Sequence, residues 1–120
     1  MPTVLITGAN RGLGFEFCRQ YAEAGWKVLA CCREPVQARD LNALSAGHPA
    51  LSVHRLDLEK FESIDALATE LAPVPIDILL NNAGVYGDPV HNRFGTLDYV
   101  LWAGVLQINA VAPVKMAERT

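Results

Sequence analysis

The sequence has little that would direct it to a membrane, out of the cell or onto a nucleic acid. No apolar run among its 120 residues approaches the roughly 20 residues that cross a bilayer. No basic segment followed by an apolar one stands at its start, so we predict no secretory signal and a cytoplasmic location. A net charge of −3, with both signs interspersed, gives no electrostatic reason to bind nucleic acid or an anionic membrane.

Cysteine is scarce too, with only Cys18, Cys31 and Cys32. The neighbours Cys31 and Cys32 would point to opposite faces of a strand and could not easily pair with each other. We interpret the odd number as reduced thiols that pack as small core residues. The three histidines are scattered and lack ligand spacing to one another or to the cysteines, so we predict no metal site.

What the sequence does have is an alternation of short β-branched runs and amphipathic stretches. It predicts strands over residues 3–7, 27–32, 51–56 and 76–80, and helices over 13–24, 35–44, 58–71 and 96–118, with a loop over 84–95. Strand-helix repetition with short connections indicates parallel strands and right-handed crossovers. We predict a single α/β domain over residues 1–120: a doubly wound parallel sheet (a Rossmann fold) in the order 3-2-1-4, incomplete on its carboxyl-terminal side.

The unusual polar motifs of the chain all follow the predicted strands, at the sheet edge where such folds bind ligands. The first has the spacing Gly-x-x-x-Gly-x-Gly between a strand and a helix. Glycine lets the backbone approach a pyrophosphate, and the helix start offers N–H groups. A turn without a ligand is the alternative, but the strand-helix context favours a dinucleotide site. Its predicted contacts are Gly8, Asn10, Arg11, Gly12, Leu13 and Gly14.

These motifs resemble those of the short-chain dehydrogenase/reductase family, most closely a subgroup that contains carbonyl reductases, sniffer and C-signalling factor. The segment 7–14 is similar to the family's glycine motif, 81–84 to its second motif, and 107–109 to the helix segment that carries its asparagine. The resemblance implies an oxidoreductase that transfers a hydride between a nicotinamide cofactor and a small-molecule carbonyl or alcohol. It also implies cofactor contacts at Asp57, Leu58, Asn82, Ala83 and Gly84, with Asn81 mainly structural.

The residues after the second predicted strand bear on cofactor choice. NAD-selective sites place a carboxylate there to bond the ribose 2′-OH. Here Arg33 follows the strand, and its guanidinium can fork onto a 2′-phosphate, with Arg11 as a second cation in the glycine loop. Each arginine alone reads as a solvated surface residue, and Glu34 is the nearby carboxylate that would favour NAD(H). The missing acid together with both arginines predicts NADP(H) rather than NAD(H).

Asn109, which the resemblance makes the candidate catalytic residue, lies in a predicted helix that is apolar almost all round and therefore expected to be buried. Pro113, four residues later, lacks the N–H that would donate to the carbonyl of Asn109, so we predict a kink there. The resemblance implies that this backbone carbonyl holds a water in the proton relay. A helix kink without a catalytic role is the alternative.

The family's catalytic tyrosine, with a lysine four residues on, and its serine are not assignable in this sequence. We therefore expect a truncated reductase whose 120 residues have no activity alone and whose fourth strand is an exposed, aggregation-prone edge. Two alternatives remain open: a non-catalytic NADP(H)-binding or regulatory module, and an interaction protein. Association of copies through the helix over residues 96–118 is possible in each case.

Overall fold

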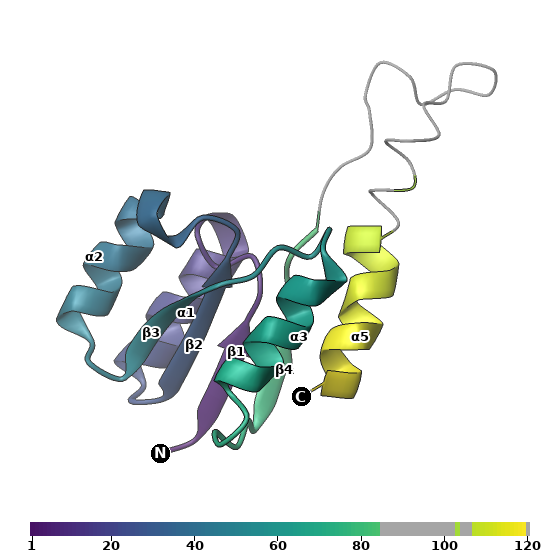
Figure 1. The fold of residues 1–120 in the computed structure, drawn as a ribbon. Helices are drawn as coiled ribbons and strands as arrows, with labels where there is room; N and C mark the ends of the chain where they lie inside the picture. Colours follow the sequence, from purple (N-terminus) through teal and green to yellow (C-terminus); the bar gives the residue numbers. More distant parts are fainter. Residues whose placement is uncertain (85–102, 104–106, 120) are drawn as a thin grey trace.

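The structure is a computed structural model that describes residues 1–84, 103 and 107–119. Its centre is a parallel sheet in the order β3-β2-β1-β4 (Figure 1). The strands are β1 (Thr3–Ile6), β2 (Lys27–Cys32), β3 (Leu51–Arg55) and β4 (Ile78–Leu80). The predicted α/β class, parallel sheet and strand order are confirmed.

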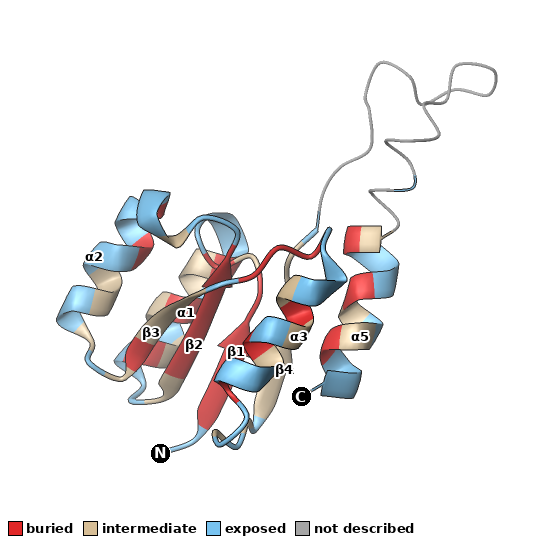
Figure 2. Ribbon diagram, viewed as in Figure 1, coloured by how far each residue is buried: buried red, intermediate tan, exposed pale blue. Residues whose placement is uncertain are grey.

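Helices cover both faces of this sheet. The apolar cluster on one face includes residues of α1 (Gly12–Glu23) and α2 (Arg39–Gly47), and the cluster on the other includes residues of α3 (Phe61–Glu70) and α5 (Ala112–Arg119). Alternate residues of β1 divide between the two cores: Val4 and Ile6 face α1 and α2, whereas Leu5 faces α3 and α5. The central strands are accordingly the most deeply buried part of the molecule (Figure 2).

Two predicted helix boundaries are wrong. The helix expected over residues 35–44 is a 3-10 turn, η1 (Pro35–Gln37), followed by α2, because the backbone of Ala38 between them is not helical. The helix expected from residue 58 begins only at Phe61, since the preceding loop has its own bonds: the Asp57 N–H donates to Ser63 Oγ at 2.9 Å. Proline and acidic residues mark a start region, but local hydrogen bonds decide where the regular helix begins.

The buried face of α1 consists of small residues. The larger apolar residues Leu13 and Phe17 are 70% and 37% exposed. The buried positions are Gly14, Cys18 and Ala22, spaced four residues apart. Small residues take this face because α1 lies close to the sheet, which pushes the larger apolar side chains to its flank.

The expected loop over residues 84–95 and the first half of the helix expected over 96–118 fall almost wholly outside the described residues. The described remainder is a π-helical turn, η2 (Gln107–Val111), that leads into α5. This interruption of regular α-helix stands just before Pro113, where we expected one. The expectation that this helix is buried all round is wrong here: Val111 and Val114 are 50% and 60% exposed, because only one side packs on α3 and the sheet.

β4 is the outermost described strand on its side of the sheet and pairs with β1 alone. Its three residues are only partly buried. No helix within the described part of the chain is long and apolar enough to cross a membrane.

Candidate functional site

The glycine loop turns tightly at the carboxyl end of β1. Gly8 and Gly12 have φ of +63° and +59°, a backbone region that residues with a side chain rarely adopt. A Cβ on Gly8 would lie 2.9 Å from Cα of Ala83. The loop is therefore held against the segment after β4, and its shape depends on the absence of side chains.

Hydrogen bonds join the ends of β1 and β4 at this edge. The Thr7 hydroxyl donates to the Leu80 carbonyl at 3.4 Å and accepts from the Ala83 N–H at 3.0 Å. The Asn82 amide donates to the carbonyls of Thr7 and Gly8 at 3.3 and 3.4 Å. Thr7 is 1% exposed and was not among the predicted site residues, although a hydroxyl at the end of an apolar strand is the signal that could have revealed it. These bonds fix the glycine loop relative to residues 82–84.

Asp57 and Leu58 lie after β3 at the same edge and are each 8% exposed. Oδ1 of Asp57 accepts from the Glu59 N–H at 3.0 Å, and Oδ2 accepts no bond within the described part of the chain. The side chain of Gln107 donates to the carbonyls of Leu58 and Glu59, which ties η2 to this loop. The Asp57 carboxylate is thus anchored through one oxygen and keeps the other as an acceptor.

Asn109 lies beside the second motif. Its Oδ1 is 3.2 Å from the position that a Cβ on Gly84 would occupy. The Asn81 amide donates to the Pro113 carbonyl at 3.3 Å, which is the structural role expected of Asn81. Asn109 is exposed rather than buried, which corrects the expectation above. The structure brings the predicted catalytic residue and the 81–84 segment together at one edge.

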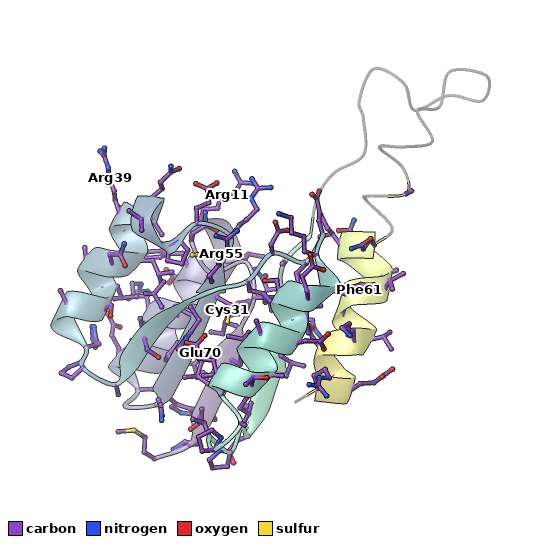
Figure 3. The ribbon with its side chains drawn as sticks, in the orientation of Figure 1. Arg11, Cys31, Arg39, Arg55, Phe61 and Glu70 are labelled. Carbon is purple, nitrogen blue, oxygen red and sulfur yellow. The ribbon has the colours of Figure 1, made fainter. Side chains whose placement is uncertain are left out.

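Four arginines stand near this edge without an ion pair. Arg33 follows β2, Arg11 is the N-cap residue of α1, and Arg55 ends β3 beside Cys32. Arg39 begins α2, and Figure 3 shows Arg11 and Arg39 projecting from the upper side of the molecule. Among the described arginines only the other two are ion-paired, Arg19 with Glu16 and Glu23 and Arg119 with Asp65. The exposed Glu34 is the nearest acidic residue in sequence to Arg33. Within the described residues, no carboxylate therefore engages these four guanidinium groups.

The three thiols belong to the core. Burial raises the pKa of Cys18 from its ordinary 9.0 to about 12, and raises the pKa of Cys31 and Cys32 as well. All three are free cysteines. Within the described residues, no cluster of histidine, cysteine or acidic side chains could hold a metal ion.

The fold and this edge define a parallel α/β protein with a glycine-rich loop where β1 and β4 end. The sequence model of the short chain dehydrogenases matches residues 2–120, and the chain belongs to this family. It is 32% identical to Protein FixR of Bradyrhizobium diazoefficiens over 122 residues, with 96% of this chain and 43% of that protein covered. It is 34% identical to (+)-neomenthol dehydrogenase of Arabidopsis thaliana, with 95% and 46% covered.

Among solved structures, the NADPH-bound carbonyl reductase from chicken fatty liver is similar over 99% of this chain and 50% of that one. The TM-score is 0.88 and the sequence identity 29%. The chain thus spans about half the length of the relatives that it matches.

Proposed function

We propose that this chain is the cofactor-binding part of an NADP(H)-dependent oxidoreductase that acts on a small-molecule carbonyl or alcohol. The observation that carries the proposal is the glycine loop at the start of α1, where Gly8 and Gly12 have positive φ and a Cβ on Gly12 would meet no atom of the described residues within 4 Å. The family membership and the NADPH-bound relative support the same function. When bound, NADP(H) supplies or accepts the hydride, and the residues below bind and orient it.

The glycine loop would hold the pyrophosphate. The positive φ values of Gly8 and Gly12 turn the backbone at the start of α1, where free N–H groups and the positive end of the helix dipole favour an anion. Asn10, Arg11 and the 70% exposed Leu13 present their surfaces at the same loop. The loop would thus bind the pyrophosphate through its backbone N–H groups and through the charge of Arg11.

The adenosine half would lie between β2 and β3. Oδ2 of Asp57 is an acceptor suited to the adenine amino group, with Leu58 beside it. Arg33 and Arg11 would neutralise the 2′-phosphate, which is the group that distinguishes NADP(H) from NAD(H). Arg55 and Arg39 stand at the same edge without an ion pair. These arginines favour NADP(H), whereas Glu34 alone would favour NAD(H).

The nicotinamide half would lie at the 82–84 segment. Asn82 is held by its bonds to the β1 end, so Ala83 and Gly84 present fixed backbone to the ribose. The side chain of Asn109 lies against Gly84. By the family resemblance, the backbone carbonyl of Asn109 would hold a water that passes the proton of the reaction. A tyrosine and a lysine in the rest of the protein would complete the proton transfer. We expect the 120 residues alone to bind NADPH without turning it over.

A non-catalytic NADP(H)-binding module is the second candidate. The described tyrosine that could serve, Tyr21, packs edge-on against Trp26 with ring centroids 4.9 Å apart and has Gly25 four residues on. The described residues would therefore bind NADP(H) but do not include the tyrosine-lysine pair of the family. This candidate predicts NADPH binding with no carbonyl reduction even in the whole protein.

The test is a binding titration of the chain with NADPH and with NADH, followed by carbonyl reduction with the whole protein. We expect NADPH to bind about tenfold or more tightly than NADH, because each 2′-phosphate–arginine pair is a charge-assisted contact. Equal affinities would contradict the cofactor choice, and no binding would contradict the proposal. NADPH oxidation by the whole protein distinguishes the enzyme from the binding module. The proposal includes a cytoplasmic location.

A further inference from the structure

Three polar side chains form a hydrogen-bonded chain on the face of the sheet that α3 covers. Ser52 Oγ lies 2.7 Å from His54 Nε2, and His54 Nδ1 lies 2.7 Å from Glu70 Oε1. Ser52 and His54 are two residues apart on β3 and so share a face, while Glu70 is the last residue of α3. None of the three is among the residues proposed above to contact the cofactor.

The partners fix where the protons lie. A carboxylate only accepts hydrogen bonds, so Nδ1 of His54 carries a hydrogen and donates it to Glu70. The neutral imidazole then has its lone pair on Nε2, which faces Ser52. The Ser52 hydroxyl therefore donates to Nε2, which is the arrangement of a serine nucleophile and its general base. The His54 side chain is 12% exposed, so this bond is largely shielded from competing water.

The edge position of β3 supplies a donor next to the serine. The Val28 N–H donates to the Ala50 carbonyl at 3.1 Å and the Leu56 N–H to the Cys32 carbonyl at 2.9 Å, so the even-numbered residues of β3 bond to β2. Val53 therefore points its N–H away from β2. No described strand pairs with β3 on that side. An acyl oxygen brought to the partly exposed Ser52 would meet this N–H.

We propose that Ser52 is an acyl-accepting nucleophile, with His54 as its general base and Glu70 as the residue that positions His54. The substrates would be small activated acyl esters, which reach an open strand edge without a deep pocket. Ser52 Oγ would bond to the ester carbonyl carbon while its proton passes to His54 Nε2. The ester C–O bond would break, and the leaving alcohol would take the proton. Water would then release the carboxylic acid and regenerate the serine.

The test uses the full chain, p-nitrophenyl acetate and a fluorophosphonate that labels activated serines. We expect hydrolysis above the buffer rate and a single label on Ser52 by peptide mass. Ser52→Ala should lose both, and His54→Gln should slow hydrolysis about 100-fold. Ser45→Ala is the matched control, because the Ser45 hydroxyl donates to the Leu51 carbonyl at 2.8 Å and has no histidine partner. Unchanged circular dichroism and NADPH binding would show that each variant is folded.

The role of Glu70 is read from the split between kcat and KM. Glu70→Gln should lower kcat about tenfold and leave KM unchanged, because an uncharged amide holds the Nδ1–H of His54 more weakly than a carboxylate does. Glu62→Gln, in the first turn of α3, should leave both constants unchanged. Hydrolysis by Ser52→Ala at the wild-type rate, or no label on Ser52, would overturn the proposal. An unchanged kcat in Glu70→Gln would overturn the role of Glu70.

Discussion

A Cβ atom on Gly14 would overlap the carbonyl oxygen of Gly8 and lie 2.6 Å from the amide nitrogen of Asn82. Gly8 has no room to retreat, because its own Cβ position is 2.9 Å from Cα of Ala83. The first turn of α1 is thus held against the end of β1, and the end of β1 against the segment after β4. A side chain at Gly14 has to open this joint.

We predict that Gly14→Ala destabilises the protein by about 1–3 kcal/mol or more and weakens NADPH binding, since the displaced atoms are backbone. Urea unfolding and an NADPH titration measure the two effects. Gly47→Ala is the control, because a Cβ there meets nothing within 4 Å, and it should be neutral or slightly stabilising. Equal stabilities of the two variants would show that the backbone around Gly8 and Asn82 can move to accommodate a Cβ on Gly14 without a loss of stability.

Reversing the charge at Arg33 should change which cofactor binds. We predict that Arg33→Asp lowers NADPH affinity far more than NADH affinity, because the new carboxylate repels the 2′-phosphate and can bond a 2′-OH. The same reversal at Lys27, at the opposite end of β2, controls for net charge and should spare the selectivity. Calorimetric titration gives both affinities. A proportionate loss for NADPH and NADH would refute the assignment of Arg33.

The buried hydroxyl of Thr7 should matter more than its methyl group. Thr7→Val leaves the Ala83 N–H without the acceptor that it has at 3.0 Å, which costs about 1–3 kcal/mol. Thr7→Ser keeps the hydroxyl and should retain most of the stability. Denaturant melts of both variants make the comparison. A valine variant as stable as the serine variant would mean that the hydroxyl contributes nothing.

The thiols should react only when the protein opens. The pKa of Cys18 is raised from 9.0 to about 12, so at pH 8 almost none of it is thiolate, and Cys31 and Cys32 shift in the same direction. We predict slow iodoacetamide labelling in buffer and rapid labelling in denaturant, read by mass spectrometry.

The same shift has a consequence for stability. Because the pKa of Cys18 is higher in the folded than in the unfolded state, this thiol makes its full contribution to the free energy of unfolding below pH 9. That contribution is lost as the pH rises from 9 toward 12. Thermal unfolding should therefore show a falling Tm over that range, less steep in Cys18→Ala. A Tm profile identical in the variant would contradict this origin.

The exposed side of η2 and α5 is the candidate surface for association of copies. Val111 and Val114 are 50% and 60% exposed on it. If copies associate there, Val114→Lys should lower the association constant in sedimentation experiments, since it places a charge in an apolar contact. Val36→Lys is the control, because Val36 is 93% exposed in η1, on a different element. Equal association of both variants would place the contact elsewhere.

The sheet order was predictable from sequence because strand-helix alternation leaves few possible topologies. The edge that carries the candidate site was predictable because the carboxyl ends of parallel strands all lie on one side of the sheet. The boundary at Ala38 was not, because it depends on the local backbone conformation of that residue. The exposure of Leu13 was not, because it depends on how close α1 lies to the sheet. The Ser52–His54–Glu70 chain was also out of reach. The spacing of Ser52 and His54 is visible, but Glu70 lies 16 residues beyond His54 on a helix whose register sets the contact.

The unpaired arginines at the cofactor edge also bear on the rate of encounter. The 120 residues carry a net charge of −3, whereas Arg11, Arg33, Arg39 and Arg55 stand without an ion pair where an anionic dinucleotide would bind. Such a field steers ligands over about one Debye length, roughly 8 Å at physiological salt. The association rate of NADPH should therefore fall steeply as salt rises, whereas its dissociation rate should change little. These four arginines would then set how quickly this part of the protein takes up NADPH.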